Sequence, residues 1–157
     1  MASADCEKPD DEELGLAAAR RPAGRSHNRL HLGGVDAFGI VYYSRYWDWY
    51  QQAFEDLLRA SGHPLPELLA DGQGFPAVHA EIDYRRTLRL GETVDCELWA
   101  GSVGRRSLRL SARFTSGDGH ILADAGTVHV SLGRNGEPRA MPEWVHGLVL
   151  TSDGSRP

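Results

Sequence analysis

The hydrophobic pattern of this 157-residue chain changes its period once, and that change restricts the fold more than any other feature. Before residue 75 the strongest signal is helical, because large apolar side chains recur every three or four positions. These side chains are Tyr43, Tyr46, Trp47, Tyr50, Phe54, Leu57 and Leu58. From Phe75 onward, apolar and polar residues alternate, as they do in strands with one buried face. The chain therefore predicts an α+β domain, and the lack of alternating strands and helices disfavours a doubly wound sheet.

Turn signals divide the alternating region and predict five strands in total. A short strand over residues 26–32 precedes the helix, and four strands in a meander follow it, ending with a long strand over residues 121–132. Ser44 is expected to cap the helix and Ser61–Gly62 to end it. Because more than half of the helix circumference is apolar, we expect a curled antiparallel sheet to wrap around it. Remaining edge strands and apolar surface predict a homo-oligomer, a dimer or a dimer of dimers.

Charge and composition divide the chain into a leader, one domain and a tail. Residues 1–13 carry six acids and one base, a net charge of −5, whereas residues 14–157 carry 16 acids and 16 arginines. We expect residues 1–25 to form a disordered acidic and Ala/Arg-rich leader, residues 26–146 a single domain, and residues 147–157 a flexible tail. The neutral body disfavours nucleic-acid binding. No apolar run reaches the ~20 residues of a membrane span, and two cysteines fit a reducing cytoplasm.

An acidic residue in a glycine-rich loop is the strongest candidate for chemistry. Asp36 lies seven residues before the expected N-terminus of the long helix. A helix N-terminus offers unpaired backbone N–H groups and the positive end of the helix dipole. A carboxylate facing such a site can attack a carbonyl carbon, or activate water to attack it, while the N–H groups hold the developing oxyanion. A role for Asp36 in closing the turn stays open on these residues alone.

A longer motif surrounds this residue. It reads Asp36-x-x-Gly39-Ile40-Val41-x-Tyr43-x-x-Tyr46, is followed by the aromatic helix, and is joined by a weaker block from Tyr84 to Glu92. Together these segments resemble the signature of the 4-hydroxybenzoyl-CoA thioesterase family of hotdog-fold enzymes. The resemblance covers about residues 27–134. It implies a hotdog fold, in which a five-stranded antiparallel sheet wraps around one long central helix. It also implies hydrolysis of an acyl- or aroyl-thioester of coenzyme A or of an acyl-carrier protein, with no cofactor and no metal.

The resemblance also implies roles for individual residues. Asp36 would be the nucleophile or general base, and the backbone amide of Tyr43 would polarise the thioester carbonyl. Gly39 would let the loop approach the substrate closely. Two positions depart from the family pattern: Gly34 stands where many relatives have a second acid, and Thr87 stands where proline is common.

Other side chains are candidates for substrate binding. Arginine binds phosphate through charge-assisted and often bidentate hydrogen bonds, which suits the phosphates of coenzyme A. The candidate phosphate ligands are Arg85, Arg86, Arg105, Arg106 and Arg134. The candidate acyl-binding residues are His31, Tyr46, Trp47, His79 and Glu81. Glu81 is also an alternative catalytic acid, and His31 is a candidate to orient Asp36; ordinary core or surface positions stay open for all of these.

Three alternative functions stay open at the level of sequence. The first is a hotdog dehydratase or a decarboxylating hydrolase acting on polyketide-like β-keto thioesters. The second is a non-catalytic protein that binds acyl thioesters, and the third is a structural dimer module. The chain has no GxSxG, Walker or dinucleotide-binding motif, and its histidines are too scattered for a metal-site motif.

Overall fold

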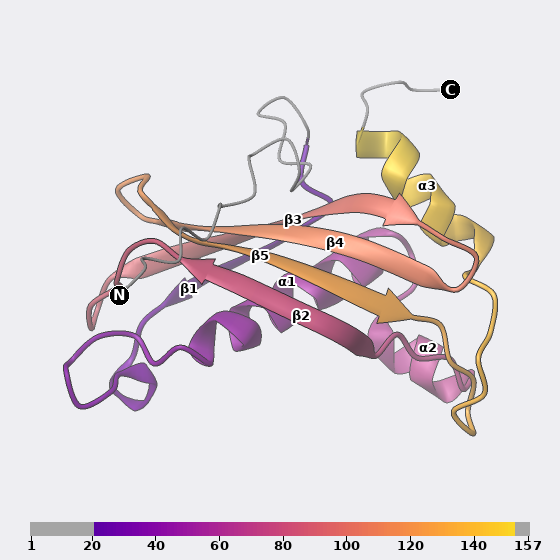
Figure 1. Ribbon diagram of the computed structural model, residues 1–157, viewed down its shortest axis with the longest axis horizontal. Helices are drawn as coiled ribbons and strands as arrows, with labels where there is room; N and C mark the ends of the chain where they lie inside the picture. The colour runs from indigo at the N-terminus through magenta and orange to yellow at the C-terminus, as the bar shows by residue number, and fades with distance from the viewer. Residues whose placement is uncertain (1–20, 153–157) are drawn as a thin grey trace, which may run out of the picture.

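Five antiparallel strands and one long helix dominate the computed structural model, which describes residues 21–152 (Figure 1). The strands are β1 (Gly24–Arg29), β2 (Ala77–Tyr84), β3 (Thr93–Val103), β4 (Ser107–Ser116) and β5 (Ile121–Val130). The helices are α1 (Arg45–Ala60), α2 (Leu65–Ala70) and α3 (Glu143–Ser152), with a 3₁₀ turn, η1 (Leu32–Gly34), after β1. The strand order is β1-β3-β4-β5-β2, so β1 and β2 are the two edges of the sheet.

The strand pairing confirms the antiparallel sheet and corrects the predicted meander. β3, β4 and β5 are consecutive neighbours, but β2 pairs with β5 and not with β3. The segment between β2 and β3 therefore crosses one end of the sheet. There it meets the loop that precedes α1, since the Val41 amide donates to the Leu88 carbonyl at 2.9 Å. This crossing places the residues after β2 beside the motif around Asp36.

Helix α1 lies against one face of the sheet and supplies much of the core. Its residues Tyr46, Ala53, Leu57 and Leu58 are almost completely buried, and each large apolar side chain contributes about 1.5–3 kcal/mol by leaving water. β1 crosses the helix at Gly24, where a Cβ atom would lie 2.3 Å from the Ala53 carbonyl oxygen. Only glycine allows strand and helix to approach this closely.

Both ends of α1 are near the predicted positions. The helix ends at Ser61 and Gly62, and Gly62 has a positive φ of 83°, which suits glycine. Ser44 occupies the N-cap position, but its side chain makes no capping hydrogen bond. The start of the helix is therefore less satisfied than the sequence predicted, and this matters for the site described below.

The segment after β5 differs from the flexible tail expected from residue 147. α3 continues to Ser152, because Val145 is fully buried and Trp144 stacks on the ring of His63 at 4.3 Å. β1 likewise begins at Gly24, within the expected leader. Residues 1–20, which include the acidic stretch, lie outside the described residues. No helix within residues 21–152 is both long and apolar enough to cross a membrane.

Candidate active site

The loop before α1 folds around the carboxylate of Asp36. Its Oδ1 atom accepts hydrogen bonds from the backbone amides of Phe38, at 2.8 Å, and Ile40, at 3.4 Å. Gly39 completes the turn with a φ of 73°, a conformation that other residues adopt only at a cost. Within residues 21–152, Oδ2 makes no hydrogen bond or ion pair. One oxygen of Asp36 thus closes the turn, and the other stays available for chemistry.

The start of α1 presents an unused backbone donor. Its neighbours are occupied, since the Tyr42 amide donates to Gly34 and the Arg45 amide to Tyr42. The amide of Tyr43 has no acceptor in the described part of the chain. The carbonyl of the same residue accepts a hydrogen bond from the Tyr84 hydroxyl at 3.2 Å. A free N–H at the positive end of a helix is suited to hold a developing negative charge.

A cavity of about 370 Å³ joins these two features. Of the predicted residues, the cavity wall includes Asp36, Tyr43, Tyr46, Arg85 and Arg86. Tyr84 also lines it, although the sequence had suggested no functional role for that side chain beyond the family motif. Burial raises the pKa of Tyr46 to about 12, and burial also raises the pKa of Tyr84. The cavity is therefore lined by neutral phenols and is large enough for an aromatic acyl group.

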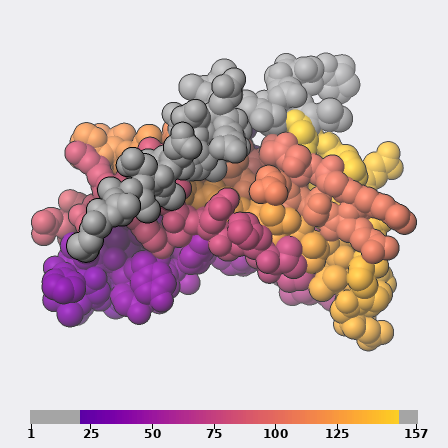
Figure 2. Space-filling view, viewed as in Figure 1, coloured from indigo at the N-terminus to yellow at the C-terminus, as the bar shows by residue number. Residues whose placement is uncertain are grey.

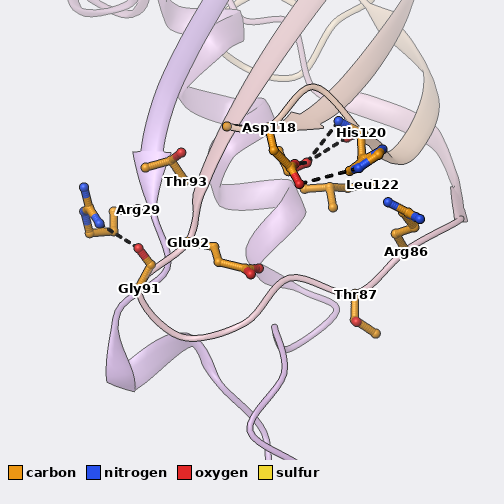
Figure 3. A pocket seen from close by; sticks show the side chains of 11 residues that line it. Arg29, Arg86, Thr87, Gly91, Glu92, Thr93, Asp118, His120 and Leu122 are labelled. Carbon is orange, nitrogen blue, oxygen red and sulfur yellow. Dashed lines mark hydrogen bonds and ion pairs between the residues drawn. The ribbon is translucent and has the colours of Figure 1, made fainter.

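A second, polar pocket of about 760 Å³ adjoins the first and shares Arg86 and Thr87 with it (Figure 3). Most charged groups in this pocket already have partners. Arg29 donates to the Gly91 carbonyl at 2.6 Å, and His120 lies 3.5 Å from Asp118. The guanidinium of Arg86 has no polar partner among residues 21–152. It is therefore an available cation at the junction of the two pockets.

Arg85, the neighbour of Arg86, is held by the sheet. Its Nη2 atom lies 2.7 Å from Asp124, whose side chain is completely buried. Arg113 contacts the other oxygen of the same carboxylate, also at 2.7 Å. Arg85 is therefore part of an ion-pair cluster around a buried carboxylate, which fixes the chain where it leaves β2.

The remaining predicted phosphate ligands lie at the opposite end of the sheet. Arg105 and Arg106 form the turn between β3 and β4, and Arg134 donates to the Ala70 carbonyl at 2.6 Å. The 11 residues of β3 separate these arginines from the Asp36 loop, a span of roughly 35 Å. Figure 2 shows the two ends as separate parts of the surface. Within one chain, the structure does not bring these three residues to the cavity.

The other predicted acyl-binding residues take different positions. His79 and Glu81 contact each other at 3.5 Å and are exposed. They project from β2 on the face opposite Tyr84, which packs on Tyr46 beneath the sheet. Trp47 is half-buried with its ring edge against Tyr50 at 5.6 Å. His31 is exposed, and no hydrogen bond links it to Asp36.

The described residues contain no group of three or more His, Cys, Asp or Glu side chains that could hold a metal ion. What the cavity does contain is a carboxylate with one free oxygen and a free amide at a helix N-terminus. This pair is suited to attack on a carbonyl carbon with stabilisation of the oxyanion.

Comparison with protein families agrees with this geometry. Residues 30–148 match the model of the thioesterase-like superfamily, so the chain belongs to that superfamily. The predicted hotdog-fold thioester hydrolase is confirmed at this level.

Individual relatives and solved structures are consistent with the family. A 1,4-dihydroxy-2-naphthoyl-CoA hydrolase from Synechococcus elongatus is 31% identical over 131 residues, covering 79% of this chain and 93% of the relative. A solved gentisyl-coenzyme A thioesterase is 26% identical with a TM-score of 0.73, covering 80% of this chain and 98% of its own. A 1,4-dihydroxy-2-naphthoyl-CoA thioesterase from Synechocystis shares the fold, with a TM-score of 0.74, 20% identity and coverage of 83% and 97%.

Proposed function

We propose that this protein hydrolyses the coenzyme A thioester of an aromatic acid, with Asp36 and the Tyr43 amide as its catalytic groups. The observation that carries the proposal is the meeting, in one cavity, of a free carboxylate oxygen and a free helix N-terminal amide. A serine or cysteine nucleophile is not needed for such a reaction. Thiolates leave readily, so a carboxylate is a sufficient nucleophile or base for a thioester.

Two balanced routes fit these groups. In the first, Asp36 Oδ2 attacks the thioester carbon, the C–S bond breaks, and coenzyme A leaves as a thiolate that takes a proton from water. Water then hydrolyses the resulting mixed anhydride and regenerates the carboxylate. In the second route, Asp36 removes a proton from water as that water attacks, and passes the proton to the leaving sulfur. In both, the Tyr43 N–H donates to the carbonyl oxygen, and one such donor contributes about 3–4 kcal/mol to the barrier reduction.

The choice of an aromatic acyl group rests on the cavity and on the relatives. Three tyrosines, Tyr42, Tyr43 and Tyr84, line the cavity with the buried Tyr46. Rings of this kind pack well against another ring, edge-to-face or offset. The relatives named above act on dihydroxynaphthoyl and gentisyl thioesters. Both acyl groups are aromatic and carry ring hydroxyls.

The choice of coenzyme A rests on Arg86. Its guanidinium, which has no polar partner in the described part of the chain, lies between the aromatic cavity and the polar pocket, where a phosphate of coenzyme A would reach it. A carrier-protein thioester, which has a single phosphate in its phosphopantetheine arm, is the competing substrate class.

We further propose that a second copy of the chain covers β2. Within residues 21–152 this edge strand pairs only with β5, and seven of its eight residues are exposed. Val78 is 61% exposed, although it is apolar. An unpaired apolar edge is a template for another strand, so pairing along β2 would cover it in a homodimer.

The deciding experiment measures free-thiol release from aromatic, medium-chain and β-keto acyl-CoA thioesters. Asp36→Asn keeps an oxygen for the Phe38 and Ile40 amides but removes the nucleophilic or basic oxygen. We expect it to remain folded and to lose at least about a thousandfold in kcat, in line with losses at catalytic side chains of hydrolases. Asp71→Asn, an exposed substitution at the end of α2, is the matched control and should keep full activity.

Other outcomes would separate the alternatives. Equal turnover by folded Asp36→Asn protein would remove Asp36 from the mechanism. Saturable binding without thiol release would favour a non-catalytic binding protein. Loss of carbon dioxide or water from the β-keto and 3-hydroxyacyl substrates would favour a decarboxylating hydrolase or a dehydratase.

A further inference from the structure

One residue of the cavity wall carries a buried hydroxyl without a partner in the described part of the chain. The Tyr46 side chain is only 1% exposed, and its hydroxyl oxygen is buried. That oxygen makes no hydrogen bond within the described residues. Buried hydroxyls in folded proteins nearly always have a partner, and an unpaired one destabilises the fold. Asn28 Nδ2 and Ser131 Oγ are also buried without a partner in the described residues, but of these three residues only Tyr46 lines the cavity, where a ligand atom can supply the missing partner.

The ring of Tyr46 is fixed in place by its neighbours. Trp49, Tyr84 and Phe114 each meet it edge-on, at centroid distances of 5.4, 5.3 and 5.0 Å. Three aromatic contacts from helix and sheet hold the ring in one orientation. The ring is thus ordered before a ligand binds, so a ligand that reaches its hydroxyl does not pay for ordering the side chain. The oxygen itself is closed off from solvent, so a ligand reaches it only when a side chain of the cavity wall moves.

The protonation state of this phenol is also defined. Burial raises the pKa of Tyr46 to about 12, so the group is neutral at pH 7 and can both donate and accept a hydrogen bond. A negatively charged phenolate, which would repel an electron-rich acyl group, is not populated at this pH.

We propose that Tyr46 is a specificity-determining residue, whose hydroxyl forms a hydrogen bond with an oxygen substituent on the ring of the acyl group. This inference rests on the proposed thioesterase function and deepens it. A cavity without a polar group would take a plain benzoyl ring as readily as a hydroxylated one. An unpaired buried hydroxyl favours the substrate that supplies its partner, because the plain ring leaves that hydroxyl unsatisfied.

The test compares benzoyl-CoA with its 2-, 3- and 4-hydroxybenzoyl counterparts. We expect the wild-type protein to hydrolyse at least one hydroxylated substrate with a kcat/KM about tenfold or more above that for benzoyl-CoA. In Tyr46→Phe this ratio falls to about one, through loss on the hydroxylated substrate alone. Tyr50→Phe is the matched control, since it removes another buried hydroxyl of α1 that does not line the cavity. It should keep the wild-type ratio.

Two results would overturn the inference. One is a wild-type protein that does not distinguish the substrates, and the other is a Tyr46→Phe protein whose activity falls equally on all of them. The second pattern would mean a packing role only.

A binding measurement keeps this test separate from catalysis. The affinities of the same four thioesters for the Asp36→Asn protein should show the same preference, which disappears on adding Tyr46→Phe. If no thioester is hydrolysed by the wild type but this binding preference is present, the proposed hydrolysis fails while the role of Tyr46 stands. If the preference is absent from binding and from turnover, the role of Tyr46 fails.

Discussion

Tyr46 and Tyr50 lie one turn apart on the same face of α1, yet their hydroxyls have opposite environments. The Tyr50 hydroxyl bonds to the Thr127 hydroxyl at 2.5 Å and to His129 Nε2 at 3.1 Å. The Tyr46 hydroxyl has no partner among residues 21–152. Both side chains are buried in aromatic surroundings. The difference teaches that the middle of the helix holds the sheet through side-chain hydrogen bonds, whereas its first turn leaves a buried hydroxyl for the ligand that we propose.

The region around Tyr50 is satisfied throughout. The Nδ1 atom of His129 donates to the Phe75 carbonyl at 2.8 Å, which leaves Nε2 to accept from a hydroxyl. The ring of Phe54 stacks on the imidazole at 4.6 Å. This network joins α1, β5 and the chain before β2, and it fixes how the helix sits on the sheet.

Removing each hydroxyl in turn tests this comparison directly, and it should give the largest change in the free energy of unfolding. Tyr50→Phe leaves Thr127 and His129 buried with an incomplete network, so the free energy of unfolding should fall by about 1–3 kcal/mol. Tyr46→Phe removes an unpaired group, so it should leave the free energy of unfolding within about 0.5 kcal/mol or raise it. Urea denaturation of both variants measures the difference. Equal destabilisation would show that the Tyr46 hydroxyl has a structural partner after all.

Lowering the pH is a second test of the network around Tyr50, with a smaller expected effect on the free energy of unfolding. Burial lowers the pKa of His129, so the folded protein keeps this imidazole neutral while the unfolded chain takes up a proton near pH 6.5. Below that pH the unfolded state therefore binds more protons than the folded state. The stability that the neutral His129 imidazole contributes to the folded protein is lost as the pH falls further. The expected loss is about 1.4 kcal/mol per pH unit, down to the lowered pKa of the folded state.

The measurement is the urea midpoint at pH 7.0 and 5.5 for the wild type and for His129→Gln. The variant should be less stable at pH 7.0 but show a shallower dependence on pH. His146→Gln, at an exposed histidine of α3, should keep the wild-type dependence. An unchanged dependence in His129→Gln would assign the acid sensitivity to other groups.

The two regions also differ in how far the sequence could predict them. The motif around Asp36 is local, so the loop and the start of α1 could be predicted from spacing and turn residues. The choice of Asp36 as the acid came from the resemblance to the thioesterase family. The Tyr50 network was not predicted, because Thr127 and His129 reach it only through the pairing of β4, β5 and β2. The same limit explains the wrong meander, since a period of two gives strands but not their neighbours.

Adjacent residues show this limit most clearly. Arg85 and Arg86 were equivalent in the sequence, but Asp124 on β5 pairs with Arg85, whereas Arg86 has no polar partner among the residues that the structure describes. Arg105, Arg106 and Arg134 were further candidates because they lie near the ends of predicted strands. Which of these arginines lies beside a cavity depends on which strand ends meet in the sheet. Those ends are far apart in the chain, so their meeting could not be predicted from local sequence.

This contrast between arginines gives the last and smallest prediction. Arg86→Ala should raise KM for the coenzyme A thioester about fivefold, or ~1 kcal/mol, because one exposed charge-assisted hydrogen bond to phosphate is lost. The effect on kcat should be small, since the phosphate is remote from the reacting carbon. Arg105→Ala, in the turn at the other end of the sheet, should leave KM unchanged.

Salt separates this electrostatic role from a loss of packing. The difference in KM between wild type and Arg86→Ala should shrink as ionic strength rises, because exposed charges are screened. A substrate ending at phosphopantetheine, without the nucleotide, adds a second comparison. If Arg86 contacts a nucleotide phosphate, the truncated substrate abolishes the effect of the variant; if it contacts the phosphate of the pantetheine arm, the effect persists and carrier-protein substrates become the better match. A fivefold rise in KM with Arg105→Ala instead would place the phosphate site at the opposite end of the sheet and, given the span of β3, on a neighbouring copy of the chain.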